Sequence, residues 1–153
     1  MLLDSRLVPE TIIKPRSFAG LMSVYESNYL RLLNLVPELE RLDGCFRSRV
    51  AGDCDLHLDI LERERYTVTM SMTYYFANES GPVADPDMLV RVYLDGQLAE
   101  AMSLGKDYRH VQFRRLYRAY REELGERWTR NVVLNKWLEY LMDQGHLILE
   151  QQA

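Results

Sequence analysis

Two neighbouring segments, residues 55–60 and 66–76, alternate apolar with polar side chains. Leu56, Leu58 and Ile60 occupy every second position of the first segment, and the second segment is apolar at every second position throughout. A period of two is typical of strands that bury one face and expose the other. We therefore predict an antiparallel hairpin, around which the rest of the fold is organised.

The register of this hairpin follows from its pattern, because apolar residues must lie opposite apolar residues. This requires an odd-numbered loop, and residues 63–65 are the shortest choice. The predicted partners are then Ile60 with Val68, Leu58 with Met70, and Leu56 with Met72. A preceding strand is expected at residues 45–50. A turn at residues 51–53 would place Arg49 opposite Asp55 and Arg47 opposite His57.

Further elements follow on both sides of this hairpin. Apolar residues at spacings of three and four predict a helix at residues 17–36, with Ser17 as N-cap and Pro37 as stop. Residues 78–87 read as a loop, and Asp95-Gly96 as the turn of a second hairpin that pairs Arg91 with Glu100. Both faces of that hairpin are apolar, so we expect it to be central or covered on both sides. The remaining predicted elements are helices at 108–124 and at 131–144, the latter ending at Gly145.

These elements predict an α+β fold, an antiparallel sheet of four to five strands with the N-terminal and C-terminal helices packed on one face. At 153 residues and 47% hydrophobic content, the chain can bury one core. We expect a loose N-terminal arm at residues 1–16 and a single domain at residues 17–149. The net charge of −4 argues against bulk nucleic-acid binding. The absence of a long apolar run argues against membrane insertion. Cys45 and Cys54 are expected to be reduced thiols, which suits the cytoplasm.

One trio of side chains has the chemistry of a metal site. Asp55, His57 and Asp59 share one face of one strand, about 6.6–6.8 Å apart in succession. A divalent metal needs its ligands within about 2–2.6 Å, which three residues in a row reach only on a curved strand. The predicted register instead gives these acids Arg47 and Arg49 as neighbours. We favour solvated salt bridges over a metal-dependent enzyme and expect no metal or cofactor.

A basic segment at residues 106–130 offers a second alternative, RNA or anion binding. Arg114, Arg118 and Arg121 fall on one side of the helix expected at 108–124 and could meet phosphates. An ordinary amphipathic helix with an arginine-rich solvent side explains the pattern more simply. Motifs of nucleophilic, phosphate-binding or zinc-dependent catalysis are missing. His110 and His146 are isolated in the sequence, so both are expected on the surface.

Four segments, in order along the chain, resemble the YqiB-like family of small proteobacterial proteins, a domain of unknown function. They are Phe18-x-x-Leu-Met-x-x-Tyr-Glu-x-Asn-Tyr-x-x-Leu-x-x-Leu-Val-Pro37, Ile60-x-Glu-x-x-Arg-Tyr-Thr67, Val90-Arg-x-Tyr-x-Asp-x-x-x-Ala-Glu100 and Asn131-x-x-Leu-x-x-Trp-Leu-x-Tyr140. The resemblance implies a single-domain cytosolic bacterial protein and brings no established activity.

The resemblance also directs attention to polar residues that composition alone would not select. These candidate binding residues are Glu26, Asn28, Glu62, Arg65, Arg91, Tyr93 and Glu100. For Asn28 the simpler interpretation is an amide that bonds to neighbouring backbone; the alternative is that it faces a pocket with Glu26. We expect a non-catalytic binding or adaptor module for a protein partner or small ligand, with its site between the first helix and the sheet.

Overall fold

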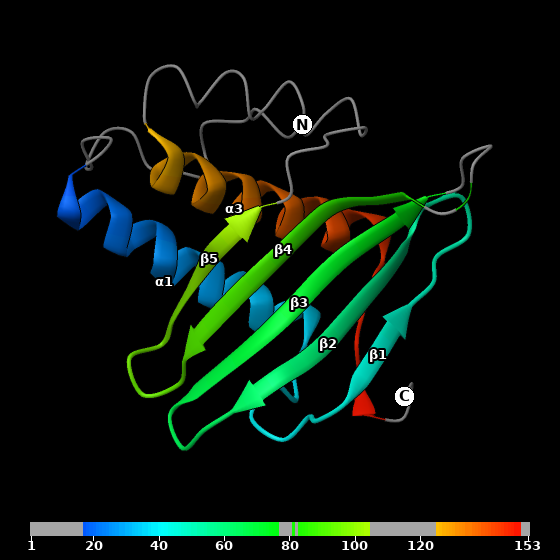
Figure 1. Ribbon diagram of the computed structural model, residues 1–153, viewed down its shortest axis with the longest axis horizontal. Helices are drawn as coiled ribbons and strands as arrows, with labels where there is room; N and C mark the ends of the chain where they lie inside the picture. The colour runs from blue at the N-terminus through cyan, green and yellow to red at the C-terminus, as the bar shows by residue number, and fades with distance from the viewer. Residues whose placement is uncertain (1–16, 77–80, 82, 105–124, 151–153) are drawn as a thin grey trace.

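The computed structural model describes residues 17–76, 81, 83–104 and 125–150. Its elements are α1 (Phe18–Leu35), β1 (Cys45–Ser48), β2 (Asp55–Arg63), β3 (Thr67–Phe76), β4 (Val83–Tyr93), β5 (Leu98–Leu104) and α3 (Glu126–Gln144). The strands form one antiparallel sheet in chain order, β1-β2-β3-β4-β5. Both helices lie behind this sheet (Figure 1). The predicted α+β class is therefore confirmed, with both helices on one face.

The core lies between the helices and the sheet face that they cover. The inward side chains Leu56 and Leu58 on β2 and Met70 and Met72 on β3 are all fully buried. The helices contribute Leu32 and Leu35 from α1, and Leu134, Trp137, Leu138 and Leu141 from α3. Burying one such side chain contributes about 1.5–3 kcal/mol, so this layer holds the helices on the sheet.

The helix signals in the sequence are confirmed at three of four ends. The Ser17 hydroxyl accepts the N–H of Gly20 at 3.0 Å, and α1 ends before Pro37. Gly145 ends α3 in the left-handed conformation, at φ 94°. The start of α3 differs, because the helix begins at Glu126 rather than at residue 131. Its first turns bury Trp128 and Val132 against Val24 of α1, a contact that the sequence pattern does not reveal.

The predicted register of β1 on β2 is confirmed. Arg47 lies opposite His57, and Arg49 forms an ion pair with Asp55 at 3.2 Å. β1 ends at Ser48 rather than at residue 50, so the connection to β2 spans residues 49–54 and is longer than the expected turn at 51–53.

The predicted register of β2 on β3 is wrong by two residues. Leu58 pairs with Met72 rather than Met70, because the turn occupies residues 64–66 and β2 has a bulge at Leu61. The bulge turns Arg63 to the helix side, where its guanidinium donates to the carbonyl oxygens of Leu39 at 2.9 Å and Glu40 at 3.0 Å. A shift of two keeps apolar opposite apolar, so alternation alone could not distinguish the two registers.

β4 begins earlier than expected, so the loop predicted at residues 78–87 is wrong for residues 83–87. The loop was expected because this segment contains Gly81, Pro82 and Pro86. In the structure, pairing passes from Thr73–Asp87 to Tyr75–Ala84, with Pro86 inside this irregularity. A bulge needs no ladder hydrogen bond from its extra residue, which is why proline fits there.

The hairpin of β4 and β5 has the predicted register, with Arg91 opposite Glu100, although its loop spans residues 94–97. Of the two alternatives for this hairpin, central or covered on both sides, the central one is wrong, because β5 is an edge strand. Side chains from the helices occupy that edge. Asn28 donates to the carbonyl oxygen of Ala99 at 3.3 Å, and Asn131 Oδ1 accepts the N–H of Ala101 at 2.7 Å.

Two sequence predictions lie outside the described residues, the N-terminal arm at 1–16 and the helix at 108–124.

Candidate functional site

Four side chains stand in one row across the sheet face opposite the helices, which we call the front face and which faces the viewer in Figure 1. Glu62 of β2 pairs with Thr69 of β3, Thr69 with Arg91 of β4, and Arg91 with Glu100 of β5. Three of these, Glu62, Arg91 and Glu100, are among the residues singled out from the sequence. The bulge at Leu61 brings Glu62 into line, so the row exists only in the observed register.

Arg91, the positive charge of the row, contacts two neutral hydroxyl groups, those of Thr69 and Tyr93. Arg91 is half-buried, and its Nε contacts the hydroxyl of Thr69 at 3.4 Å. Within the described residues Arg91 forms no ion pair, although Glu100 is its cross-strand partner. Arg91 and Glu100 therefore lie opposite each other as expected, but their side chains do not form an ion pair. The guanidinium therefore keeps donor capacity for an anionic group on the front face.

The carboxylate of Glu100 is shared by two phenols instead. Tyr93 donates to Glu100 Oε1 at 2.6 Å. Burial, followed by the charge and hydrogen bond of Glu100, raises the pKa of Tyr25 on α1 to about 12. Burial and the same carboxylate also raise the pKa of Tyr93. Glu100 thus links α1 to the front face at the β5 edge, whereas the sequence placed the expected site between the first helix and the sheet.

The other candidate binding residues lie elsewhere. Glu26 is exposed on α1, whereas Asn28 is fully buried and bonds to backbone, so these two do not face one pocket. The simpler interpretation of Asn28 is confirmed. Arg65 is exposed in the β2–β3 turn, with its guanidinium carbon 5.1 Å from the centre of the Tyr66 ring.

The three residues of the metal alternative remain on the front face and do not converge. The carboxylate of Asp55 pairs with Arg49, and the ring of His57 packs edge-on against Tyr75 with centroids 4.6 Å apart. In the part of the chain that the structure describes, no three His, Cys, Asp or Glu side chains form a group that could hold a metal ion. The alternative site for nucleic acid, Arg114, Arg118 and Arg121, lies outside the described residues.

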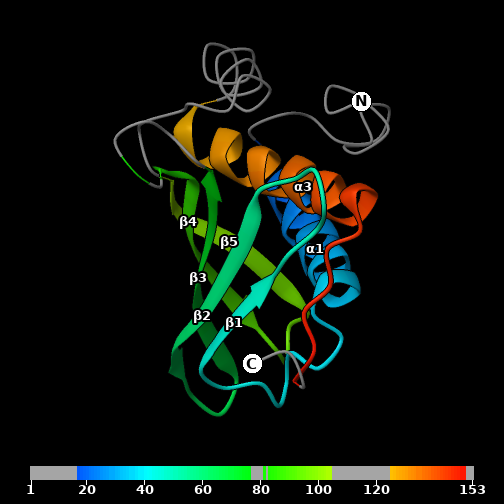
Figure 2. The same ribbon diagram turned by 90° about the vertical axis from the view of Figure 1, so that its right-hand side faces the viewer.

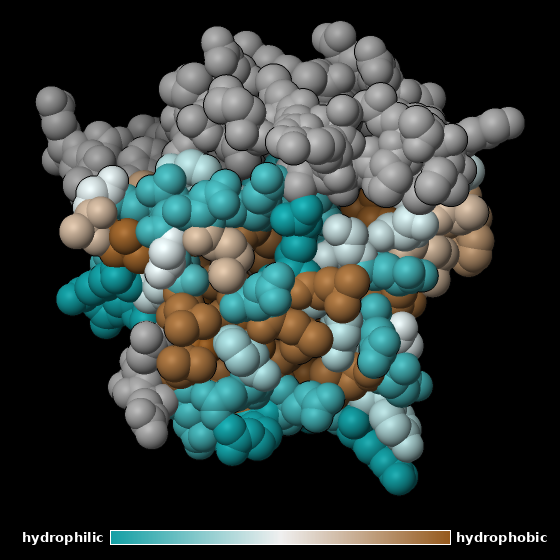
Figure 3. Space-filling view, turned by 180° about the vertical axis from the view of Figure 1, so that it is seen from behind, coloured by the Kyte–Doolittle hydropathy of each residue, from teal (hydrophilic) through white to brown (hydrophobic). Residues whose placement is uncertain are grey.

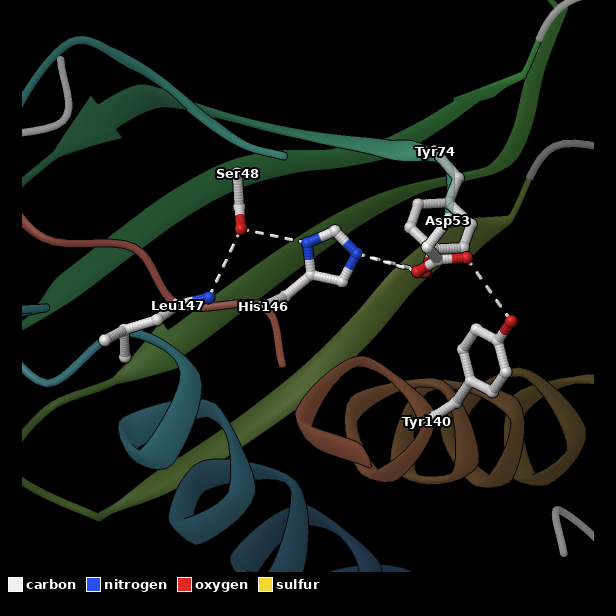
Figure 4. A network of polar contacts seen from close by, with 6 residues as sticks. All are labelled: Ser48, Asp53, Tyr74, Tyr140, His146 and Leu147. Atoms are coloured by element: carbon white, nitrogen blue, oxygen red, sulfur yellow. Dashed lines mark hydrogen bonds and ion pairs between the residues drawn. The ribbon is translucent and has the colours of Figure 1, made fainter. Parts of the chain in front are cut away.

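A buried polar network is centred on His146, so the expectation of a surface histidine is wrong. His146 is 1% exposed. Its Nδ1 lies 2.9 Å from the hydroxyl of Ser48, and its Nε2 lies 2.8 Å from Asp53 Oδ2 (Figure 4). The N–H of Leu147 also donates to the Ser48 hydroxyl, at 3.2 Å. The apolar run that follows His146 at residues 147–149 is the one sequence signal that this segment returns to the core.

Two tyrosines complete the network around Asp53. Tyr74 donates to Asp53 Oδ2, and Tyr140 donates to Oδ1 at 3.4 Å. Burial would raise the pKa of Asp53, but hydrogen bonds from Tyr74 and His146 outweigh it, and the pKa lies below its ordinary value. Burial and the Asp53 charge raise the pKa of Tyr74 and raise that of Tyr140 to about 12. The network therefore holds one buried carboxylate in its charged form.

A Ser-His-Asp set suggests nucleophilic catalysis, but the surroundings of Ser48 favour a structural role. Ser48 is only 5% exposed, and its hydroxyl oxygen already accepts the N–H of Leu147. A catalytic serine needs room for a substrate carbonyl and donors for the oxyanion. These three residues instead link the segment after α3 to β1 and to the turn that follows β1.

Fold and site together define a small α+β domain whose five-stranded antiparallel sheet presents a row of polar and charged side chains opposite its two helices. A sequence profile of the family described as "Protein of unknown function (DUF1249)" matches residues 31–147. The chain belongs to this family. No curated protein and no solved structure matches the chain. Among the described helices, none combines the length and the apolar character that crossing a membrane would require.

Proposed function

We propose that the protein is a non-catalytic binding module that recognises a partner protein or small ligand through the front face of its sheet, around Arg91. The observation that carries the proposal is the row of Glu62, Thr69, Arg91 and Glu100 across four adjacent strands. A strand scaffold fixes such side chains in position before a ligand arrives, which lowers the entropic cost of binding.

The charges of the row indicate what it recognises. Arg91 offers donors to a carboxylate or phosphate, while the exposed Glu62 at one end favours a cation. A partner that presents an anionic group and a basic group, separated by the distance across two strand spacings, would match both residues. Tyr93 adds a half-buried aromatic side chain to the same face, of the kind that commonly anchors interfaces.

The resemblance to the YqiB-like family and the two free cysteines support a further part of the proposal, that the module acts in the bacterial cytoplasm.

The test compares Arg91→Ala with Arg41→Ala, a control at an exposed arginine outside the sheet. Tagged wild-type protein and both variants are used to capture partners from native cells, and captured proteins are quantified by mass spectrometry. We expect a partner whose recovery falls at least ten-fold with Arg91→Ala and is unchanged with Arg41→Ala. A thermal-shift screen of anionic metabolites repeats the comparison for small ligands.

A second variant separates recognition from folding. Glu62→Ala removes an exposed carboxylate from the other end of the row and leaves the core untouched. It should weaken the binding of the same partner or ligand that Arg91→Ala affects. If every partner and every ligand is retained by both variants, the front face is not the binding site.

A further inference from the structure

The two edges of the sheet differ in whether side chains bond to their outward backbone groups. At β5, the helix side chains Asn28 and Asn131 bond to outward backbone groups, and Arg130 donates to the carbonyl oxygen of Ala101 at 2.9 Å. Covering an edge in this way blocks the addition of another strand. β1 forms the opposite edge.

The outward groups of β1 can be assigned from its ladder. Ile60 donates its N–H to the carbonyl oxygen of Gly44 at 2.8 Å. Hydrogen-bonding positions alternate along an antiparallel pair, so Phe46 also faces β2, and the backbone groups of Cys45 and Arg47 face away from the sheet. No side chain of the described residues hydrogen-bonds to these outward groups. This edge is therefore available for strand addition.

A groove runs along this free edge, between β1 and the segment that follows α3. Figure 2 shows that segment descending beside β1. The groove has a volume of about 640 Å³. Its lining residues are Cys45, Phe46, Arg47, Ser48, Arg49, His57, Asp59, Gly145 and Leu147. The network of His146 fixes the segment to Ser48, so both walls are held in place without a ligand.

The two sides of the groove differ in chemistry. On the front-face side, Arg49 is paired with Asp55, and hydrogen bonding with Asp59 raises the pKa of the Cys45 thiol. Arg47 is exposed, and among the described residues its guanidinium has no ion-pair or hydrogen-bond partner. On the helix side, the groove is bordered by the half-buried Leu147.

We propose that this groove binds an extended peptide segment that adds to β1 as a sixth strand and alternates acidic with apolar side chains. Successive side chains of a strand point to opposite faces. The acidic residues of such a segment would reach Arg47, and the apolar residues would lie against Leu147. Its backbone would pair with Cys45 and Arg47, so backbone hydrogen bonds supply affinity and side chains supply specificity. This site is separate from the Arg91 row and does not depend on it.

The test uses three labelled nine-residue peptides and fluorescence anisotropy. One alternates valine with glutamate, the second alternates valine with lysine, and the third is the glutamate peptide with N-methyl groups on alternate backbone nitrogens, prepared in both phases. We expect the glutamate peptide to bind at least ten-fold more tightly than the lysine peptide. One phase of N-methylation should abolish binding, because it removes the donors that face β1. The Arg47→Glu variant should reverse the preference between glutamate and lysine.

Hydrogen exchange supplies a second measurement if affinity is low. A saturating glutamate peptide should slow amide exchange at Cys45 and Arg47 and leave Leu98 at the β5 edge unchanged. The Arg91→Ala variant should bind the peptide like wild type, which separates this site from the front-face row. Binding that survives N-methylation in both phases, or that is unchanged by Arg47→Glu, would overturn the proposal, as would the absence of any binding at millimolar peptide.

Discussion

The carboxylate of Asp53 collects hydrogen bonds from three segments that are distant in sequence. Tyr74 lies on β3, Tyr140 on α3, and His146 beyond the helix end. The side chain of Asp53 is only 5% exposed. A buried charge is tolerated when such donors replace its hydration, and it becomes costly when they are removed. Asp53 is thus the residue at which the turn after β1, the sheet and α3 are joined.

Replacing Asp53 with asparagine should destabilise the protein in a pH-dependent way. The pKa of Asp53 in the folded protein is lowered, whereas an aspartate in the unfolded chain has a pKa of about 3.9. The charged Asp53 therefore stabilises the folded protein fully at pH values above the pKa of the unfolded chain. This stabilisation is lost as the pH falls through the pKa of Asp53 in the folded protein. We expect Asp53→Asn to lower the free energy of unfolding by about 1–3 kcal/mol at pH 7. Urea unfolding should show this difference narrowing below about pH 4.

Asp55→Asn serves as the control for this measurement, because Asp55 is two residues away and pairs only at the surface with Arg49. Exposed ion pairs contribute about 0–1 kcal/mol, so this variant should remain close to wild type at every pH. If the difference in the free energy of unfolding between wild type and Asp53→Asn stays constant down to pH 3, the Asp53 charge is not what the network stabilises.

At the scale of residues, the sequence predicted neighbours across a hairpin and missed neighbours across the fold. Arg47 opposite His57 and Arg91 opposite Glu100 follow from a period of two and a short turn. Ser48 and His146 are separated by 98 positions, and no local pattern connects them. A lone histidine after a helix end is usually exposed, and only its burial in the folded protein reveals its partners.

Among the elements, β5 shows how helices can complete a sheet rather than only cover it. Asn131 accepts the N–H of Ala101 and donates to the carbonyl oxygen of Arg127 at 2.9 Å. The same side chain contacts Asn28 of α1. Both asparagines are fully buried. These amides replace the partner strand that an edge lacks, and they position both helices on it.

Asn131→Ala should therefore cost more than the loss of one exposed amide. It leaves the buried N–H of Ala101 without an acceptor, and an unsatisfied buried group costs about 1–3 kcal/mol. We expect the midpoint of urea unfolding to fall accordingly. Asn34→Ala, at an exposed position of α1, provides the matched control and should change stability by less than about 0.5 kcal/mol. Equal midpoints for the two variants would show that the β5 edge is satisfied without Asn131.

The types of the described elements and the registers of β1 on β2 and of β4 on β5 were predictable, and the register of β2 on β3 was not. Alternation and helical spacing identified β2, β3, β5, α1 and α3, because these patterns record which face is buried. The register of β2 on β3 depended on the bulge at Leu61, after which Arg63 binds carbonyl oxygens of Leu39 and Glu40, contacts that no local pattern predicts. The row of Glu62, Thr69, Arg91 and Glu100 depends on that offset, so the sequence named three members of the row without showing that Glu62 lines up with the other two.

At the scale of the whole molecule, the segment that follows α3, residues 145–150, packs against the core between β1 and the end of α1. Ile148 is fully buried, and its N–H donates to the carbonyl oxygen of Leu35 at the end of α1 at 2.9 Å. Figure 3 shows hydrophobic side chains gathered on the helix side of the molecule, where this segment lies. The segment also forms one wall of the β1 groove, so stability and the proposed peptide site share the same residues.

Ile148→Ala tests whether this segment is part of the cooperative core. Removing a fully buried isoleucine typically costs about 2–5 kcal/mol, because the transfer free energy is lost and a cavity remains. Leu30→Ala, at a leucine that is 62% exposed on α1, should cost less than about 0.5 kcal/mol. Thermal unfolding followed by circular dichroism gives both values. A large loss for Ile148→Ala with a single transition means that the segment folds with the sheet and holds the groove wall in place. If Ile148→Ala unfolds at the same temperature as Leu30→Ala, the segment detaches independently, and the groove then lacks the preformed wall on which peptide binding depends.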